Sequence, residues 1–438
     1  MNEYKKSEID WIGNIPKQWD ISRIKYTSEI YTGNSISDSL KSLYEDSENA
    51  YPYISTKDID ANDDTIDYNN GLYTKKNDFN FRVAPKNSTL LCIEGGSAGR
   101  KISKLNQNVS FVNKLCCFNA KSINPNYLYF YLKSKSFKEE FNQHISGLIG
   151  GVSQSILKSF YIIVPPKEEQ SKISNYLNDK ITKLDCTLKK LYRQIEILEK
   201  YKKSIITETI ISGLNNNKNY KDSGDSWIKY IPNDYIITKV KYVTQKVTDG
   251  SHIAPDTTEN IHKFVSVTDM NEFGTIDFLN CLKITDEQYE YLVKTGCKPK
   301  KKDVIISKDG TIGKTTIIDN NEDFVIASSL VIMRPNNIII NERYLRYNLM
   351  SEYVQAQLET LLVGSALKRV SVYKNANLRI ILTKNINEQI EIANYLDKKC
   401  NLINTIIKNK KSQIEKIENY KQSIIYEYVT GKKRVKGE

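Results

Sequence analysis

The chain has 438 residues, of which 39% are hydrophobic and 26% are charged, and its formal net charge is +12. This length suits two or three domains, and the basic balance favours nucleic acid over a membrane surface as a partner, although an ordinary soluble basic protein would show the same charge. The start "MNEYKKSEIDW" has no apolar signal core and no apolar run approaches 18 residues, so we expect a soluble, cytoplasmic protein with no membrane contact.

The seven cysteines are odd in number and include no Cys-x-x-Cys pair, and the chain has only three histidines. This usage predicts reduced thiols, with neither a disulfide framework nor a zinc site. We therefore expect no metal in this chain.

Residues 1–168 read as a first domain of short β-rich runs, turn residues and one short helix at "PNYLYFYLKSKSF". Asn124 precedes that helix and Pro125 opens it, which is a typical helix start. The turn "EGGSAGRK" carries side chains that suit DNA contacts, namely Ser97, Arg100 and Lys101. Pro165-Pro166 ends the domain.

Residues 169–213 read as a long helix, because apolar residues recur at spacings of four and three, which is a heptad seam. Its positions are Leu184, Leu188, Leu191, Ile195 and Leu198. A helix of about 40 residues is about 60 Å long, and alone it would leave this seam in water. A polar, Asn-rich linker follows at 214–221.

Residues 222–386 read as a second β-rich domain with two polar turns. The first, "TDGSHIAP", offers Asp249, Ser251 and His252, and with no nucleophile or metal partners at useful spacing we interpret His252 as a hydrogen-bonding contact. The second is "SKDGTIGKTT", where Gly310 and Gly313 permit a tight turn. From it we expect four side chains to project toward DNA: Lys308, Thr311, Lys314 and Thr315. Lys368 completes the candidate contacts of this domain.

The stretch "SKDGTIGKTT" resembles a phosphate-binding loop, but such a loop needs glycine five positions before Gly-Lys-Thr. That position is Lys308. A turn facing DNA is therefore the better interpretation.

Residues 387–431 read as a second long helix, followed by a basic tail at 432–438. Its seam positions match those of the first helix and are Ile403, Ile407, Lys410, Ile414 and Ile417. The lysine weakens the apolar strip locally and can help to set register. Each seam could pack on its own domain, but two matching seams in one chain pair more simply with each other.

The chain is an internal repeat at offsets between 211 and 219. "WIGNIPKQWDISRIKY" recurs as "WIKYIPNDYIITKVKY", "EEQSKISNYLNDK" as "NEQIEIANYLDKK", and "YKKSIITETI" as "YKQSIIYEYV". The predicted fold class is α+β: two similar β-rich domains separated by two long helices that pair as an antiparallel coiled coil with a pseudo-two-fold repeat. Because the linker joins the first helix to the second domain, antiparallel pairing would place the domains at opposite ends of a rigid rod.

These repeated motifs, in this order over the whole chain, resemble the specificity subunit of a Type I restriction-modification enzyme. The resemblance implies that 1–168 and 222–386 are target-recognition domains, and that 169–213 and 387–431 are conserved helical regions that act as a spacer. It implies double-stranded DNA as the ligand, with one half-site per domain. It also implies two modification subunits that carry S-adenosylmethionine, restriction subunits that use ATP and Mg²⁺, and no catalytic residue or cofactor in this chain. The first domain lacks the "TDGSH" form of its turn.

Two other classes compete with this interpretation. A self-contained adenine methyltransferase would need an Asn/Asp-Pro-Pro-aromatic segment, and the nearest stretch, "NPNY" at 124–127, lacks the second proline. No glycine-rich cofactor fingerprint opens a βαβ unit. A non-catalytic coiled-coil scaffold would explain the helices but not two basic domains with matching polar turns.

Overall fold

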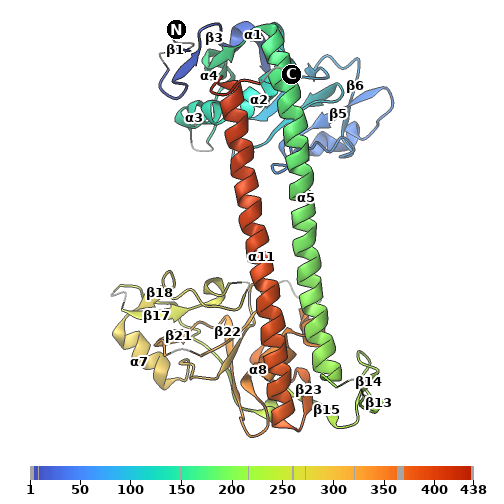
Figure 1. Ribbon diagram of the computed structural model, residues 1–438, viewed down its shortest axis with the longest axis vertical. Helices are drawn as coiled ribbons and strands as arrows, with labels where there is room; N and C mark the ends of the chain where they lie inside the picture. The colour runs from blue at the N-terminus through green and yellow to red at the C-terminus, as the bar shows by residue number, and fades with distance from the viewer. Residues whose placement is uncertain are drawn as a thin grey trace. The chain divides into compact units, whose positions relative to one another are not determined.

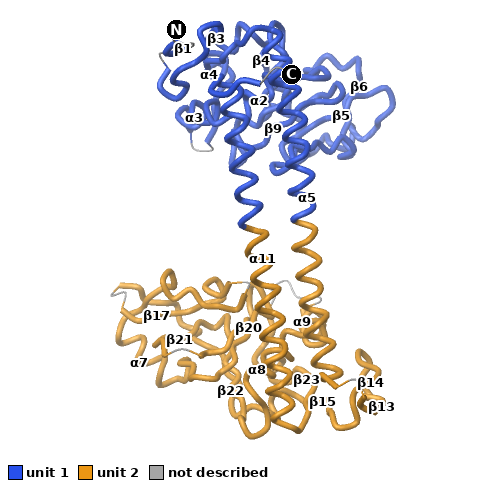
Figure 2. Tube along the Cα trace, viewed as in Figure 1, with its two compact units in different colours: residues 1–191, 412–438 blue, residues 192–411 orange. Residues whose placement is uncertain are grey.

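The structure is a computed structural model that describes residues 4–7, 9–147, 150–215, 217–258, 261–271, 273–319, 321–362 and 369–435. The chain forms two compact units (Figure 2). Unit 1 contains residues 1–191 and 412–438, and unit 2 contains residues 192–411. Each unit combines one β-rich part with a segment of each long helix, α5 (Lys167–Ser212) and α11 (Ile386–Val429) (Figure 1).

The β-rich part of unit 1 is built from short strands, four short α-helices and two 3₁₀ turns. The strands are β1 (Tyr4–Lys6), β2 (Asn14–Pro16), β3 (Asp20–Arg23), β4 (Ser28–Thr32), β5 (Ala50–Ile54), β6 (Tyr73–Lys75), β7 (Val83–Ala84), β8 (Thr89–Cys92), β9 (Ile102–Lys104), β10 (Val109–Phe111), β11 (Leu115–Ala120) and β12 (Tyr161–Val164). The helices are α1 (Ile24–Thr27), α2 (Pro125–Lys133), α3 (Lys135–Gln143) and α4 (Gln154–Ser159), and the 3₁₀ turns are η1 (Asp38–Tyr44) and η2 (Thr56–Asp58).

Among the described residues, unit 2 repeats most of this order, but it has no counterpart of η1 and holds a helix, α7 (Asp286–Lys294), between β18 and β19, where unit 1 has strand β7. Its strands are β13 (Tyr220–Asp222), β14 (Tyr230–Pro232), β15 (Tyr235–Lys239), β16 (Thr244–Asp249), β17 (His262–Val265), β18 (Leu282–Ile284), β19 (Val304–Ser307), β20 (Thr315–Ile317), β21 (Phe324–Ile326), β22 (Leu330–Pro335) and β23 (Arg379–Thr383). Its other helices are α6 (Val240–Val243), α8 (Glu342–Met350), α9 (Glu352–Leu362) and α10 (Val372–Ala376), and its 3₁₀ turn is η3 (Val267–Asp269).

The sheets show that the repeat is structural. An antiparallel four-stranded sheet has the order β4-β11-β8-β9 in unit 1 and β16-β22-β19-β20 in unit 2. A second sheet contains one parallel pair in each copy, β5 with β10 and β17 with β21. Strands β8, β10, β19 and β21 are buried at every residue, which explains their largely apolar sequences, whereas strands such as β1 and β13 are mostly exposed. The predicted fold class is confirmed.

Each β-rich part is fixed to a long helix through a helix cap. Asn124 caps α2 by accepting from the backbone N–H groups of residues 126 and 127, as its position before Pro125 predicts. Its own N–H donates to Gln170 Oε1 of α5 at 2.7 Å. In unit 2, Asn341 caps α8 and donates in the same way to Gln389 Oε1 of α11 at 2.8 Å. These buried glutamines hold the start of each long helix to its domain.

The two long helices run antiparallel within each unit. In unit 1, the rings of Tyr176 and Tyr428 lie 4.6 Å apart, and Asp185 pairs with Lys421. In unit 2, Lys410 Nζ donates to Gln194 Oε1 at 2.7 Å, and Lys202 Nζ donates to Asn404 Oδ1 at 2.8 Å. Within each unit the residue number rises along α5 as it falls along α11, which defines the antiparallel direction.

The heptad seam lies in this helix contact. Six of its ten positions are buried, namely Leu188, Leu191, Ile195, Ile403, Ile407 and Ile414. The other four are partly exposed, namely Leu184, Leu198, Lys410 and Ile417. The helix ends also enter the domain cores, with Ile424 and Ile425 packed in the first and Ile206 and Ile210 in the second. Within the described residues, no helix is both long enough and apolar enough to cross a bilayer.

Candidate nucleic-acid interface

The glycine-containing turns lie at equivalent places in the two domains. One joins β8 to β9, and the other joins β19 to β20. Gly95 and Gly99 have φ of +83° and +69°, and Gly310 and Gly313 have +68° and +86°, a region that favours glycine. Both turns connect antiparallel strands, whereas a phosphate-binding loop leads from a strand into a helix. The nucleotide interpretation is therefore excluded by topology as well as by Lys308.

Ser307 makes the second turn rigid. Its Oγ donates to the carbonyl of Thr311 at 2.5 Å and accepts from the N–H of Lys314 at 2.9 Å. On the other side, Gln355 of α9 donates to the carbonyl of Gly313 at 3.2 Å. The turn therefore presents its exposed side chains from a fixed backbone.

The backbone hydrogen bonds show which positions of the two turns correspond. The N–H of Cys92 bonds the carbonyl of Lys101, and the N–H of Ser307 bonds the carbonyl of Lys314. Lys101 is thus the counterpart of Lys314, and both amino groups donate to a backbone carbonyl, of Thr56 at 2.7 Å and of Met270 at 2.6 Å. Aligning "GRK" of the first turn with "GKT" of the second would pair Arg100 with Lys314, and this pairing is wrong. Arg100 lies between Gly99 and Lys101, whereas Lys314 follows Gly313 directly.

The predicted contact residues differ in accessibility. Arg100, Thr311 and His252 are exposed. Ser97, Lys101, Asp249 and Lys314 are partly exposed. The remaining described candidates are buried, namely Ser251, Lys308 and Thr315. Lys368 lies outside the described residues.

The expectation that Lys308 and Thr315 project from the turn is wrong. Thr315 pairs with Ile306 inside the β19–β20 ladder, so its side chain points into the sheet. Ser251 is also held inward, because its N–H donates to the carbonyl of Ile326 at 2.8 Å and its Oγ donates to the carbonyl of Ile253 at 3.1 Å. DNA contact by these three side chains stays a prediction that their burial disfavours.

Lys308 lies at the centre of a chain of charges that joins the two polar turns of the second domain. Its side chain is only 3% exposed, and its Nζ lies 3.6 Å from Asp249 Oδ2 and 3.1 Å from Asp309 Oδ2. Asp249 also accepts His252 Nε2 at 2.9 Å, and Asp309 accepts Arg369 Nε at 2.8 Å. His252 is therefore a hydrogen-bonding residue with no nucleophile beside it in this network.

Arg369, like Asp309, is a residue of this network that the sequence did not single out. Its side chain is 61% exposed, and its backbone forms a bridge with Asp309. It lies about 60 positions away from its partner along the chain, so spacing gives no signal for the contact. The sequence offers one hint that Arg369 is functional, which is that the basic pair "KR" follows the mostly apolar stretch "LLVGSAL".

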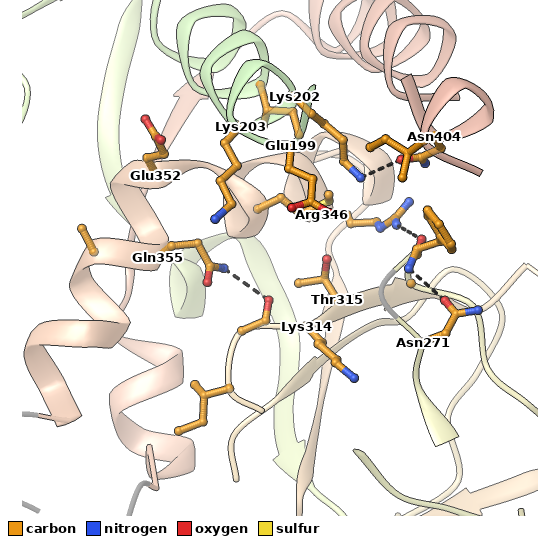
Figure 3. A pocket seen from close by; sticks show the side chains of 18 of the residues that line it. Glu199, Lys202, Lys203, Asn271, Lys314, Thr315, Arg346, Glu352, Gln355 and Asn404 are labelled. Carbon is orange, nitrogen blue, oxygen red and sulfur yellow. Dashed lines mark hydrogen bonds between the residues drawn. The ribbon is translucent and has the colours of Figure 1, made fainter. Parts of the chain in front are cut away.

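A cavity of about 540 Å³ in unit 2 lies beside the glycine turn, between α5, α8, α9 and α11 (Figure 3). Lys203, Lys314, Arg346 and Gln355 are among the side chains around it, and Arg346 Nε is buried without a hydrogen-bond partner. Unit 1 has a cavity of about 530 Å³ at the equivalent place, beside Arg100.

The described residues include no group of three or more His, Cys, Asp or Glu side chains that could hold a metal. All seven cysteines are free, and six are buried, with burial raising the pKa of Cys92, Cys116 and Cys117. The side chain of Asn124 in "NPNY" is occupied in capping α2.

Comparisons with known proteins agree with this geometry. The family model described as "Type I restriction modification DNA specificity domain" matches residues 16–197 and 255–416. The Type I restriction enzyme MjaVIII specificity subunit of Methanocaldococcus jannaschii is 27% identical, over 96% of this chain and 94% of that protein. The Type I restriction enzyme EcoBI specificity subunit of Escherichia coli is 22% identical, over 77% of this chain and 70% of that protein.

A solved structure from work on complex assembly and conformational transition of the type I R-M system has the same fold. The TM-score is 0.68 at 14% sequence identity, covering 95% of this chain and 98% of that one. Two matched domains, two antiparallel helix segments and a polar turn in each domain lead to one conclusion: the chain belongs to the family of Type I restriction-modification specificity subunits.

Proposed function

We propose that this specificity subunit reads a bipartite DNA site, with one half-site bound by residues 1–168 and the other by residues 222–386. One observation carries the proposal: both domains build the same turn between equivalent strands but expose different side chains. The first turn exposes Arg100, whereas the second exposes Thr311. A shared scaffold with different exposed donors suits two half-sites of different sequence.

The proposed DNA contacts of the two turns are chosen by the exposure of their side chains. Because Arg100 and Thr311 are exposed, we assign the DNA contacts of the two turns to them. A guanidinium suits both phosphate and a guanine edge. Lys101 and Lys314 brace their turns through backbone carbonyls and contribute positive charge beside the phosphates. The net charge of +12 supports the phosphate-binding, salt-dependent share of the affinity.

Partner subunits supply the chemistry in this proposal. Two modification subunits bring S-adenosylmethionine and methylate adenine, and restriction subunits bring ATP and Mg²⁺ for translocation and cleavage. The chain itself contributes recognition and acts in the bacterial cytoplasm. Support comes from the relatives, which are named specificity subunits of restriction enzymes.

The helical regions 169–213 and 387–431 act as the spacer, with 214–221 as linker and 432–438 as a basic tail. If the paired helices set the distance between half-sites, inserting one heptad near Leu191 and one near Lys410 lengthens the preferred DNA spacer. Both half-site sequences stay unchanged. Mapped methylation sites measure this directly, and a changed half-site sequence contradicts the spacer role.

The function is tested by mapping methylated adenines in a host that expresses the modification subunits with and without this chain. The expected result is one bipartite sequence that is methylated only when the chain is present. Methylation by the purified chain alone with labelled S-adenosylmethionine contradicts the proposal, as does a site that is not bipartite.

A further inference from the structure

The Lys308 network is present in only one of the two domains. Lys308 occupies the same backbone position as Ile93, because both lie in a matched pair of hydrogen bonds. In the first domain, the N–H of Ile93 donates to the carbonyl of Lys114, and the carbonyl of Ile93 accepts from the N–H of Val152. In the second domain, the N–H of Lys308 donates to the carbonyl of Ser329, and the carbonyl of Lys308 accepts from the N–H of Val370. Ile93 is 7% exposed and Lys308 is 3% exposed. The same buried site therefore holds a hydrophobic side chain in one domain and a charged one in the other.

The other members of the network are also specific to the second domain. By strand register, Asp249 opposite Val331 corresponds to Thr32 opposite Cys116. By backbone bridge, Asp309 with Arg369 corresponds to Glu94 with Gly151. Only Glu94 keeps a charge, and it lies 3.9 Å from Lys114 instead.

A buried lysine is a costly way to fill this position. Removing an ammonium group from water is expensive, and replacing a buried ion pair with a hydrophobic residue of similar volume is often neutral or stabilising. Ile93 shows that this turn folds with an aliphatic side chain at the site. The fold therefore does not require the ammonium of Lys308, and the two carboxylates that it holds need another explanation.

The exposed residue at one end of the network, Arg369, suggests why the two carboxylates are held there. Asp309 is 17% exposed and Arg369 is 61% exposed, so a nearly buried carboxylate, itself neutralised by Lys308, orients a solvent-facing guanidinium. When a carboxylate holds a guanidinium through Nε, the planar group is fixed in orientation, and its terminal N–H groups remain available to donate side by side to another partner. That is the geometry for a bidentate contact with guanine O6 and N7 in the major groove.

We propose that Arg369 is a specificity-determining residue that reads a guanine in the second half-site, and that Lys308 is a positioning residue that acts on it through Asp309. This inference rests on the proposed function, since it assigns residues of the same DNA-reading surface. In this proposal the two aspartates act as supports that hold Lys308 and Arg369. His252 on Asp249 marks the other end of the same surface.

The test uses the full complex with modification subunits and compares Arg369→Ala, Lys308→Ile and the double variant. Lys294→Ala is the control, because it removes a positive charge from the exposed face of α7. Binding is measured on duplexes carrying the mapped site, with each base of the second half-site varied in turn. Methylated adenines are mapped for every variant in cells.

Arg369→Ala is expected to weaken cognate binding by roughly 5- to 150-fold and to remove the guanine preference at one position of the second half-site. Lys308→Ile is expected to relax the same position and to lower the melting temperature only modestly, because Asp249 and Asp309 lose the ammonium but are partly exposed and keep His252 and Arg369 as partners. Because Lys308 acts through Arg369, its substitution costs less in the Arg369→Ala background than alone. The first half-site and the Lys294→Ala control keep their wild-type specificity.

The proposed function and the inference about Arg369 can be contradicted separately. If the wild-type complex methylates no bipartite site, the proposed function fails. If it does so and Arg369→Ala keeps every base preference of the second half-site, the inference alone is overturned. Additive effects of the two substitutions overturn the positioning role of Lys308, and a large loss of stability in Lys308→Ile shows that the ammonium serves the fold.

Discussion

At the scale of single residues, Glu140 of α3 shows how burial sets a protonation state. Its side chain is 4% exposed, Oε1 accepts from the N–H of Tyr161 at 3.3 Å, and Oε2 has no hydrogen-bond partner. Burial raises the pKa of Glu140 from 4.5 to about 7, against the opposing effects of the Tyr161 hydrogen bond, His144 and Arg23. The folded chain therefore holds this proton over a pH range in which the unfolded chain has released it.

Glu140 gives the stability a pH dependence of defined sign. Between the unfolded pKa of 4.5 and the folded pKa of about 7, the folded state binds more protons, so the free energy of unfolding falls as pH rises. The loss amounts to about 2–4 kcal/mol across that window. Glu140→Gln removes the titrating group and should become progressively more stable than wild type from pH 5 to pH 7.

Thermal unfolding of both proteins at several pH values measures this difference. Glu139→Gln is the matched control, because the neighbouring side chain is 41% exposed and pairs with Lys135. Parallel curves for wild type and Glu140→Gln would show that the carboxyl group is not titrating in this range.

The first glycine turn offers a second test at this scale. Gly99 has φ of +69°, and a Cβ there would lie 2.9 Å from the ring of Phe141. Gly99→Ala should lower the free energy of unfolding by about 1–2 kcal/mol from backbone strain, with the ring contact adding to it. Gly96→Ala, three residues away, meets no heavy atom within 4 Å and should change stability by less than about 0.5 kcal/mol. Equal effects in denaturant unfolding would contradict the assigned turn geometry.

At the scale of elements, the two long helices show where periodicity is informative. The heptad spacing identifies both seams, and the structure buries Leu188, Ile195 and Ile407 in them. Lys410 interrupts the second seam, and its amino group reaches Gln194 on the opposing helix. A polar side chain at such a position specifies register at a cost in stability.

Lys410→Ile should therefore strengthen the helix contact, by about 1 kcal/mol for the apolar area it adds to the seam. Lys408→Ile is the control, since residue 408 is exposed outside the seam. Thermal unfolding should show a higher melting temperature for Lys410→Ile alone. No change in that variant would show that residue 410 lies outside the apolar contact.

The repeat reveals much of the fold from sequence, because apolar strands, helix starts and heptads carry local patterns. Asn124 and its cap are predictable from the Pro125 that follows. The burial of Lys308 is not, since lysine is rarely buried without a partner and one of its partners, Asp249, lies on another turn. The correspondence of Lys101 with Lys314 also depends on strand register. Aligning the letters of "GRK" with those of "GKT" pairs the wrong residues. Arg369 meets Asp309 only through the folded chain.

At the scale of the whole molecule, the chain is a specificity subunit whose two halves share a framework and differ in the side chains they expose. The shared parts are the four-stranded sheet, the capped helix and its glutamine, and the antiparallel helices. The different parts are the charged network, α7 and the exposed turn residues. The central claim is that each half reads its own half-site independently.

Exchange of residues 222–383 for the equivalent domain of another family member tests that claim most directly. The measurement is a map of methylated adenines in cells that carry the modification subunits with either the native or the exchanged chain. The account predicts that one half of the bipartite sequence changes to that of the donor, while the other half and the spacer stay as they are. A map in which both halves change, or in which neither does, would contradict it.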